Sequence, residues 1–395
     1  MSMTENRWLL PDGVQELLPP EAAAVEARRA ELLALYDRWG YDLVMPAMME
    51  FRDSLLTGTA RALEEKTFTL VDQSSGRLLG VRSDMTPQVA RIDAHLLADE
   101  RPVSRLCYCG HLLHAKADGL DPNRSPLQVG AELFGHAGIE ADIEIVSLMI
   151  ETLQAIPLSR IAVDLGHVGL FRGLFAASGL DARVEERLFD MLQRKSIPEL
   201  KAFLSELDLD KNRRRQFCEL ALLNGGIEVL AEARALLADA PTDCQAALDQ
   251  IETVARAVTE RYADVQIHCD LSELRGYDYH TGLVFAAFLP GQGREVARGG
   301  RYDAIGEVFG HARPATGFSA DLLALHGLSR QAAEARAGIL APARADAGLQ
   351  RLVAELRDSG ERVIIDLSDG ALPPEQQGCR QAIVKNGDRW VVKEV

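Results

Sequence analysis

Two short segments of this 395-residue sequence carry polar and charged residues at spacings that favour ligand binding. The segment VRSDMTPQVAR holds Asp84 and Thr86 at an expected junction between a strand and a helix. The segment QVGAE holds Gln128 and Glu132, which share one face of a strand because side chains two positions apart point the same way. Together the two segments offer two carboxylates, a hydroxyl and an amide.

A third segment, RGYDYHTG, crowds Arg275, Tyr279 and His280 between glycines, and the segment RGGRYD follows it. Glycine has no side chain, so the backbone can pass close to a ligand at these positions. A zwitterionic amino acid needs anions for its ammonium group, an arginine for its carboxylate and polar groups for its side chain. The three segments contain that set, so the sequence favours an amino-acid pocket if they converge in the fold.

Each segment also has a purely structural interpretation. Arg275 and Asp278 could form an ion pair within their own loop, and Gln128 and Glu132 could face solvent. The paired glycines of RGGRYD could form a hairpin turn. The sequence leaves these alternatives open, because it does not show which side chains meet.

The composition and the absence of familiar motifs exclude several classes of function. The chain has 59 acidic and 43 basic residues and a formal net charge of −16. A nucleic-acid binder needs lysine and arginine to displace the counterions of phosphates, so this balance argues against wide contact with nucleic acid. The sequence has no GxxxxGK[ST], strand-linked GxGxxG, HExxH or GxSxG motif. We expect no cofactor and no metal.

The cysteines and the N-terminal segment indicate a cytoplasmic protein. The six cysteines are too few and too scattered for a disulfide framework; they are Cys107, Cys109, Cys218, Cys244, Cys269 and Cys379. Residues 1–20 contain charges and prolines where a signal peptide needs an apolar run. No apolar stretch reaches the roughly 18 residues that suggest a membrane span, so we expect no contact with a membrane.

The pattern of apolar residues predicts the elements that position these segments. Helices are expected at residues 20–39, 87–97, 141–155 and from 317 to 325, and strands at 104–110, 126–135, 160–166, 265–269 and 283–289, with a hairpin over 68–81. The connection 111–125 is longer than a usual hairpin loop, and the sequence does not assign its role. Strands and helices alternate without regular βαβ units, which predicts an α+β fold with a mostly antiparallel sheet flanked by helices.

The same pattern predicts two domains. Residues 168–263 are almost wholly helical and form a helical insertion in a core that extends over residues 1–328. Residues 337–395 contain a short strand, a helix, the strand RVIIDL and a final strand pair, which make a small C-terminal α/β domain.

Over roughly residues 8–328 the chain resembles histidyl-tRNA synthetase. The segments RGYDYHTG and GGRYD are similar to the two histidine-specific signatures of that family, usually RGLDYYTG and GGRYD. SDMT resembles the PEGT motif of the family, QVGAE resembles QxGxE, and residues 20–46 resemble the class II dimer-interface motif. The resemblance implies a class II synthetase core, with a six- or seven-stranded antiparallel sheet, and a homodimer.

The resemblance also implies a histidine pocket made of Asp84, Thr86, Gln128, Glu132, Arg275, Tyr279 and His280. It assigns the ligand's ammonium group to Asp84, Thr86 and Gln128, and its carboxylate to Arg275 and Gln128. Glu132 and His280 would contact the imidazole. His280 stands where the family usually has a second tyrosine, so its protonation is expected to make binding depend on pH.

The chain departs from the synthetase motifs where they bind ATP. The motif-2 arginine falls on Cys109, and the motif-3 pattern GFAxGLERL falls on GFSADLLAL. Asp321 therefore stands at a glycine, and Ala324 at the arginine that stacks on adenine. Adenylation needs fixed guanidinium groups, so no ATP site is expected. The C-terminal domain resembles a shortened anticodon-binding domain, and the chain from Arg330 onward contains ten acidic and ten basic residues, so we expect no tRNA binding.

A histidine pocket without ATP-binding groups is typical of the ATP phosphoribosyltransferase regulatory subunit family, which the whole chain resembles. The resemblance implies a non-catalytic partner of the short-form catalytic subunit, in a hetero-octamer of four regulatory and four catalytic chains. It also implies feedback inhibition by L-histidine in the first step of histidine biosynthesis. The alternatives are a working histidyl-tRNA synthetase and a free-standing paralogue that binds an amino acid.

Overall fold

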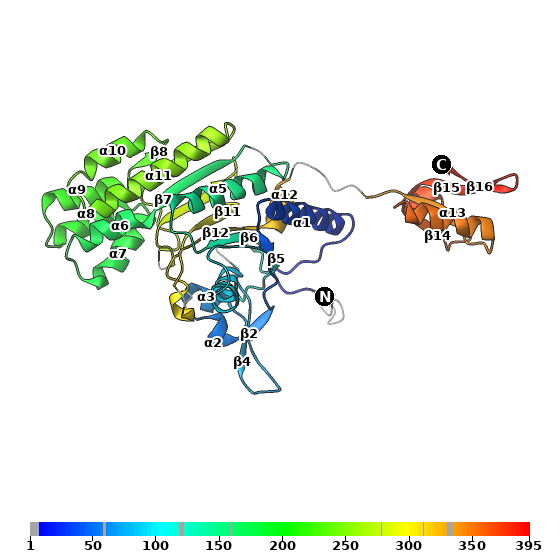
Figure 1. Cartoon of the computed structure of the whole chain (residues 1–395), viewed down its shortest axis with the longest axis horizontal. Coiled ribbons are helices and arrows are strands. Elements are labelled where there is room, and N and C mark those ends of the chain that lie inside the picture. The colour runs from blue at the N-terminus through cyan, green and yellow to red at the C-terminus, as the bar shows by residue number, and fades with distance from the viewer. Residues whose placement is uncertain are drawn as a thin grey trace, which may run out of the picture. The chain divides into compact units, whose positions relative to one another are not determined.

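The structure is a computed structural model in which two compact units are distinguished (Figure 1). The residues that it describes are 8–57, 61–117, 122–158, 160–277, 279–310, 312–329 and 335–395. One unit is built mainly from residues 27–330, and the other from residues 331–395 together with 16–26. Each unit has its own sheet and its own hydrophobic core.

In the part of the chain described, the first unit is built on a nine-stranded sheet of order β1-β5-β6-β12-β11-β10-β7-β9-β8. Its strands are β1 (Asp42–Leu43), β5 (Ser104–His111), β6 (Leu127–Phe134), β12 (Ala315–Asp321), β11 (Ala297–Arg301), β10 (Leu283–Phe288), β7 (Ala162–His167), β9 (Gln266–Asp270) and β8 (Asn224–Gly225). The pairs β1–β5 and β7–β9 are parallel, and the other neighbouring pairs are antiparallel. The α+β fold with a mostly antiparallel sheet is therefore confirmed.

The sheet has more strands than the six or seven that the resemblance implies. The difference comes from β1 and β8, which are two residues long and extend the two edges of the sheet. Strand β8 was not predicted, because two residues are too few to show the alternation by which a strand is recognised.

Two long helices pack against this sheet. Helix α5 (Ile139–Gln154) has a continuous buried face, and α1 (Glu21–Arg38) carries the buried Tyr36 in the part that belongs to the first unit. The Tyr36 ring meets Phe318 of β12 edge to face, with the ring centroids 6.3 Å apart. Thr152 of α5 donates a hydrogen bond of 3.1 Å to the Tyr36 hydroxyl, which ties the two helices together. Figure 1 shows α5 running along the strands.

The segment 168–261 is mostly helical, as its sequence predicts, and is shown in green shades in Figure 1. Its helices are α6 (Val168–Ala176), α7 (Ala182–Gln193), α8 (Ile197–Glu206), α9 (Lys211–Leu220), α10 (Val229–Leu236) and α11 (Thr242–Arg261). Asp181 and Asp210 cap α7 and α9 by accepting hydrogen bonds from backbone N–H groups of the first turn. The basic run KNRRR, residues 211–215, therefore lies at the start of a capped helix.

A smaller sheet of order β2-β4-β3 lies beside the main one. Its strands are β2 (Met49–Phe51), β4 (Leu78–Val81) and β3 (Thr69–Val71), and the short helices α2 (Arg52–Leu55) and α3 (Arg61–Lys66) lie between β2 and β3 in the chain. The hairpin β3–β4 is the one that the alternation over 68–81 predicts. After β4 the chain enters α4 (Thr86–Ile92), which continues as one π-helical turn over Asp93–Leu97.

One sequence-based assignment is wrong. Residues 317–321, predicted as the start of a buried helix, belong to β12, which pairs with β6 and β11 near the middle of the sheet. A short buried run does not show helical or strand periodicity by itself, and here the flanking strands decide the outcome. The helix begins only at Leu322, as α12 (Leu322–Leu328), because the Asp321 carboxylate caps it by accepting from the Leu323 N–H.

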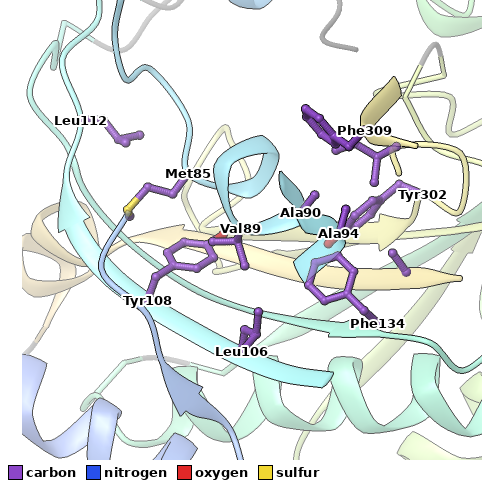
Figure 2. Close-up of a cluster of buried hydrophobic side chains, with 12 residues drawn as sticks. Met85, Val89, Ala90, Ala94, Leu106, Tyr108, Leu112, Phe134, Tyr302 and Phe309 are labelled. Carbon is purple, nitrogen blue, oxygen red and sulfur yellow. The ribbon is translucent and has the colours of Figure 1, made fainter. Parts of the chain in front are cut away.

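A compact apolar cluster lies under the junction of α4 with β5 and β6 (Figure 2). Its members are Met85, Val89, Ala90, Ala94, Leu106, Tyr108, Leu112, Phe134, Tyr302, Ile305, Phe309 and Ala315. Burying a large apolar side chain contributes about 1.5–3 kcal/mol, so such a cluster holds these elements firmly. Tyr108 and Tyr302 belong to it and are fully buried, which fixes the positions of their hydroxyl groups.

The second unit contains a four-stranded sheet of order β14-β13-β15-β16 and one long helix. Its elements are β13 (Gly338–Pro342), α13 (Ala347–Asp358), β14 (Val363–Asp366), the 3-10 turn Pro374–Gln377, β15 (Cys379–Asn386) and β16 (Arg389–Glu394). Asp346 caps α13 and accepts a hydrogen bond of 2.9 Å from the indole of Trp390. Among the described residues of the whole chain, no helix is long and apolar enough to span a membrane.

Candidate functional site

A cavity of about 450 Å³ lies in the first unit, against strands β6, β10, β11 and β12. Its wall includes six of the seven residues predicted to bind an amino acid: Asp84, Thr86, Glu132, Arg275, Tyr279 and His280. The seventh, Gln128, donates a hydrogen bond of 2.9 Å to Asp84. The fold therefore brings the three segments together around one cavity.

Asp84 and Gln128 hold each other in place at one side of the cavity. Oδ1 of Asp84 accepts from the Gln128 amide and, at 3.0 Å, from the backbone N–H of Thr86. The Gln128 carbonyl oxygen accepts at 2.9 Å from the Met85 N–H. Both side chains are thus oriented by the first residues of α4, and Gln128 is buried, which excludes the solvent-facing alternative for this residue.

Glu132 is the most deeply buried acid of the cavity, with 1% of its surface exposed. Its carboxylate accepts hydrogen bonds from the Tyr108 hydroxyl at 2.8 Å and from the Tyr302 hydroxyl. Burial raises the pKa of Glu132 to about 8, although the two phenols and the Thr86 hydroxyl pull it down. The carboxyl group therefore tends to hold a proton near neutral pH, and a cationic ligand bound beside it would favour loss of that proton to solvent.

Two glycines make room for this arrangement. A Cβ atom at Gly130 would lie 2.6 Å from the Tyr108 hydroxyl oxygen, and a Cβ at Gly317 would collide with the Glu132 carboxylate. The glycine of QVGAE is therefore needed for the close approach of Tyr108 to the acid. The glycines of RGGRYD lie within β11 instead of forming a turn, which excludes the hairpin alternative.

Tyr279 offers a hydroxyl group that, among the described residues, has no hydrogen-bond partner although it is buried. Its ring stacks on Tyr302, with the ring centroids 5.0 Å apart. Burial and the nearby charges of Glu132 and Asp84 raise the pKa of Tyr279 well above its usual value. A buried polar group without a partner is costly, so this hydroxyl is best explained by a ligand that completes its hydrogen bonding.

His280 is neutral near neutral pH. Burial lowers its pKa to about 4, and its Nδ1 lies 3.3 Å from the carbonyl oxygen of Arg301. If Nδ1 carries the proton, it donates to that carbonyl and Nε2 is left as an acceptor. The pH dependence expected from the protonation of His280 therefore belongs to acidic conditions.

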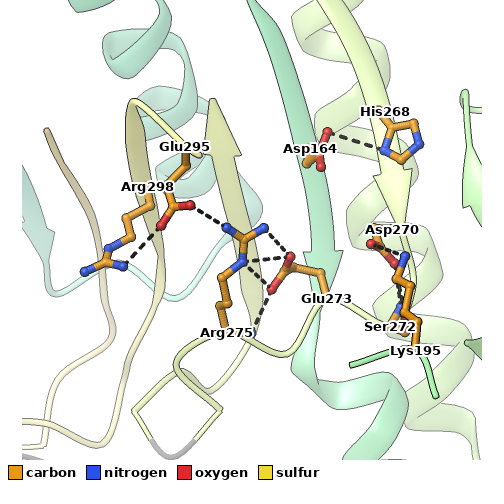
Figure 3. A network of polar contacts seen from close by, with 9 residues as sticks. All are labelled: Asp164, Lys195, His268, Asp270, Ser272, Glu273, Arg275, Glu295 and Arg298. Atoms are coloured by element: carbon orange, nitrogen blue, oxygen red, sulfur yellow. Dashed lines mark hydrogen bonds and ion pairs between the residues drawn. The ribbon is translucent and has the colours of Figure 1, made fainter. Parts of the chain in front are cut away.

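Arg275 lies between two carboxylates (Figure 3). Its Nη2 donates to Glu273 at 2.6 Å, its Nε donates to the same carboxylate at 3.0 Å, and its Nη1 donates to Glu295 at 2.8 Å. A guanidinium group has five N–H donors, and these two carboxylates engage three of them. Asp278, the ion-pair partner that the sequence suggested, lies outside the described residues.

Several residues of the site were missed by sequence reasoning. Tyr108 and Tyr302 hold Glu132, and Glu273 and Glu295 hold Arg275. Only Tyr302 had a signal, because it belongs to the RGGRYD segment. Tyr108 and Glu295 come from segments that only the fold brings near their partners, whereas Glu273 is two residues from Arg275 in the chain. No cluster of potential metal ligands is present among the described residues.

Comparison with known proteins decides the family. A family model described as histidyl-tRNA synthetase matches residues 13–325, and one described as ATP phosphoribosyltransferase subunit HisZ C-terminal domain matches residues 336–393. The ATP phosphoribosyltransferase regulatory subunit of Thioalkalivibrio sulfidiphilus is 53% identical over 99% of both chains. That of Alkalilimnicola ehrlichii is 50% identical over 98% of both chains. The chain belongs to the ATP phosphoribosyltransferase regulatory subunit family.

Solved structures agree with this family and with the class II fold. The chain is similar to an ATP phosphoribosyltransferase regulatory subunit/histidyl-tRNA synthetase from Bacillus halodurans, with a TM-score of 0.83 and 25% identity, over 94% of this chain and 96% of that one. Histidyl-tRNA synthetase from Nostoc has the same fold, with a TM-score of 0.80 and 17% identity, over 98% of this chain and 95% of that one.

In this regulatory-subunit chain, a second cavity of about 460 Å³ lies near the positions of the synthetase ATP motifs. Ala324 and Asp321 line it, whereas Cys109 lies on β5 opposite Val129 of β6 and is not among the residues that line this cavity. The Asp321 carboxylate accepts from the backbone N–H groups of Leu127 at 3.1 Å and Leu323 at 3.0 Å, and from the Asn123 amide at 3.0 Å. Asp321 therefore joins β6 to α12 and has a structural role.

Proposed function

We propose that the chain is a non-catalytic regulatory subunit of ATP phosphoribosyltransferase in the first step of L-histidine biosynthesis. In this proposal the short-form catalytic subunit needs the chain for activity, and the chain transmits feedback inhibition by histidine. Full-length relatives named for this role, at about half identity, support the proposal. The single observation that carries the histidine part is the cavity with its convergent polar groups.

The groups around the cavity match the parts of a histidine molecule. Asp84, which faces the cavity beside Thr86, suits the ammonium group. Arg275 suits the carboxylate, because a guanidinium group can bind it through two parallel hydrogen bonds. The buried Glu132 suits an imidazole N–H, and the unpartnered Tyr279 hydroxyl suits a remaining polar atom of the ligand.

The absence of catalysis belongs to the same proposal. Cys109 and Ala324 cannot neutralise charge on the phosphates of ATP or stack on adenine as arginine does. Asp321 stands where the synthetase family has a glycine, and its carboxylate is engaged by Asn123 and by two backbone N–H groups, so it supplies no group for a nucleotide. A working histidyl-tRNA synthetase is therefore disfavoured, and a free-standing amino-acid-binding paralogue is disfavoured by the names of the relatives.

We propose the assembly from the family and from the surface of the first unit. Leu43, Met45, Met48 and Met49 are exposed apolar residues in and next to the segment that resembles the class II dimer interface. An exposed apolar patch of this kind suits a homodimer contact. We further propose a hetero-octamer of four regulatory and four catalytic chains, in the cytoplasm.

The C-terminal domain, residues 337–395, is proposed to have no tRNA-binding role. The chain from Arg330 onward contains ten acidic and ten basic residues, so it lacks the positive charge with which proteins bind a phosphate backbone. A matched family model named for the HisZ C-terminal domain supports this assignment.

Two assays on the full-length chain test the proposal. Isothermal calorimetry should detect histidine binding, and ATP–pyrophosphate exchange with histidine should be absent. Histidine-dependent exchange would show a working synthetase. Histidine binding without any effect on the catalytic subunit would indicate a free-standing paralogue.

A further inference from the structure

Four charged side chains of alternating sign form a row beside the cavity, and three of them, Glu273, Arg275 and Arg298, line it (Figure 3). Glu273 and Glu295 lie on either side of Arg275, and Arg298 follows Glu295. Arg275 donates from Nη1 to Oε2 of Glu295 at 2.8 Å, and Arg298 donates from its own Nη1 to Oε1 at 3.3 Å. Glu295 therefore bridges the arginine of the cavity and an arginine that is 60% exposed.

The two acids hold Arg275 in different ways. Glu273 is two residues away in the chain, contacts both Nε and Nη2, and also accepts from the Arg275 backbone N–H at 2.8 Å. Glu295 makes one contact and comes from the connection between β10 and β11. A bidentate contact with backbone support is harder to displace than a single bond, so Glu273 is the fixed partner and Glu295 the exchangeable one.

The connection that carries Glu295 has room to adjust. Its residues 290–294 are exposed, and Gly291 has a φ of 82° with nothing within 4 Å of a Cβ atom placed on it. Gly293 also has open space around it. Because neither glycine packs against other groups, a shift of the Glu295 carboxylate requires no rearrangement of the sheet.

We propose that Glu295 competes with the carboxylate of the ligand for Arg275 and thereby sets the affinity of the cavity for carboxylate-bearing ligands. This inference rests on the proposed function, which makes histidine the ligand. The ligand carboxylate accepts from Nη1 of Arg275 in place of Oε2 of Glu295. The released acid keeps Arg298, which already contacts its other oxygen. Glu295 is thus a specificity-determining residue that also links occupancy of the cavity to the exposed connection.

Calorimetry with two ligands on the full-length chain tests the inference. Histidine carries the carboxylate, and histidinol has a hydroxymethyl group in its place. In Glu295→Gln the competing charge is removed while the shape is kept, so the histidine Kd should fall about tenfold. The histidinol Kd should stay within about twofold, because histidinol does not displace Glu295.

Three further variants make the result specific. Glu295→Asp keeps the charge but shortens the side chain by one methylene, so it should also tighten histidine binding. Unchanged binding in this variant would mean that Glu295 acts through its charge at a distance and not through its contact with Arg275. Glu186→Gln removes the same charge from an exposed position on α7 and should change neither Kd. Glu273→Gln removes the fixed partner that supports Arg275 and should weaken histidine binding. Thermal unfolding of each variant checks that the fold is kept.

The outcomes separate this inference from the proposed function. If the wild-type chain binds histidine but Glu295→Gln does not bind it more tightly, the competition is refuted and the proposed function stands. Equal tightening of histidine and histidinol would also refute it, because the effect would not pass through the carboxylate. If the wild-type chain binds neither ligand, the histidine pocket itself fails and the inference fails with it.

Discussion

Glu132 has the most unusual chemistry of the cavity, because it is a buried carboxyl group held by two phenols. Burial favours its protonated form, and the phenols and the Thr86 hydroxyl only partly offset this. The negative side chain of Asp84 adds to the effect by repulsion. A ligand with an ammonium or imidazolium group would stabilise the ionised form. Proton uptake or release is therefore expected to accompany ligand binding near neutral pH.

This raised pKa predicts how stability depends on pH. With a folded-state pKa of about 8 against an ordinary value of 4.5, the folded state binds the proton more strongly than the unfolded state. Stability should therefore fall as pH rises from about 5 to 8, by at most about 1.4 kcal/mol per pH unit from this group. Urea unfolding of the ligand-free chain at several pH values measures the slope. Glu132→Gln should remove that contribution, and an unchanged slope in the variant would contradict the assignment.

Arg275→Ala should weaken histidine inhibition without breaking the assembly. The substitution removes the charge that binds the ligand carboxylate and leaves Glu273 and Glu295 to repel it. Losing a charge-assisted bond costs about 1.5–3 kcal/mol, so the histidine concentration for half inhibition should rise about 10- to 100-fold. Titration of the complex with histidine measures this shift, and size-exclusion chromatography measures assembly. Arg183→Ala, at an exposed position on α7, is the control, and inhibition unchanged from wild type in Arg275→Ala would exclude Arg275 from the pocket.

At the same scale, the residues that the sequence could and could not predict differ in a physical way. Asp84, Gln128 and Glu132 were predictable because their spacing and their resemblance to family motifs mark them. Glu295 was not, because its contact with Arg275 depends on how the connection after β10 returns across the sheet. The role proposed for Glu295 depends on its closeness to Arg275 in the folded chain, which no local sequence pattern shows.

At the scale of elements, strand β6 carries Glu132 and strand β12 provides the space that the Glu132 carboxylate occupies. Gly317 of β12 lies opposite Glu132 of β6 in the antiparallel register. The Glu132 carboxyl group therefore occupies the place that a side chain at position 317 would take. The sequence predicted most strands and helices but assigned residues 317–321 to a helix. The apolar and small residues of that stretch suit both structures, and only the pairing with β6 and β11 makes it a strand.

A pair of glycine substitutions tests this arrangement. Gly317→Ala places a methyl group against the Glu132 carboxylate and should destabilise the fold by about 1–3 kcal/mol and impair ligand binding. Gly327→Ala is the matched control on α12, where a Cβ atom meets nothing within 4 Å. Because alanine favours a helix over glycine, it should be neutral or stabilise by up to about 1 kcal/mol. Urea unfolding compares the two, and similar values would argue against close packing at Gly317.

At the scale of the whole molecule, the sequence predicted the fold class and the small C-terminal α/β sheet. The number of strands in the main sheet was underestimated, because β1 and β8 are too short to have a pattern. The surface that contacts the catalytic subunit could not be predicted from this sequence. Which exposed residues suit an interface depends on the surface of the partner, and the partner is a separate chain. The connection 289–296, in which residues 290–294 are exposed, is the segment that ligand binding is proposed to shift.

The measurement that tests the central claim most directly is phosphoribosyl transfer to ATP by the short-form catalytic subunit, with and without this chain, while histidine is titrated. A regulatory subunit should change the turnover and make it sensitive to histidine, because the cavity and the catalytic site are coupled; couplings of about 1–3 kcal/mol are typical. Turnover and histidine response that stay unaltered at saturating concentrations of the chain would contradict the claim.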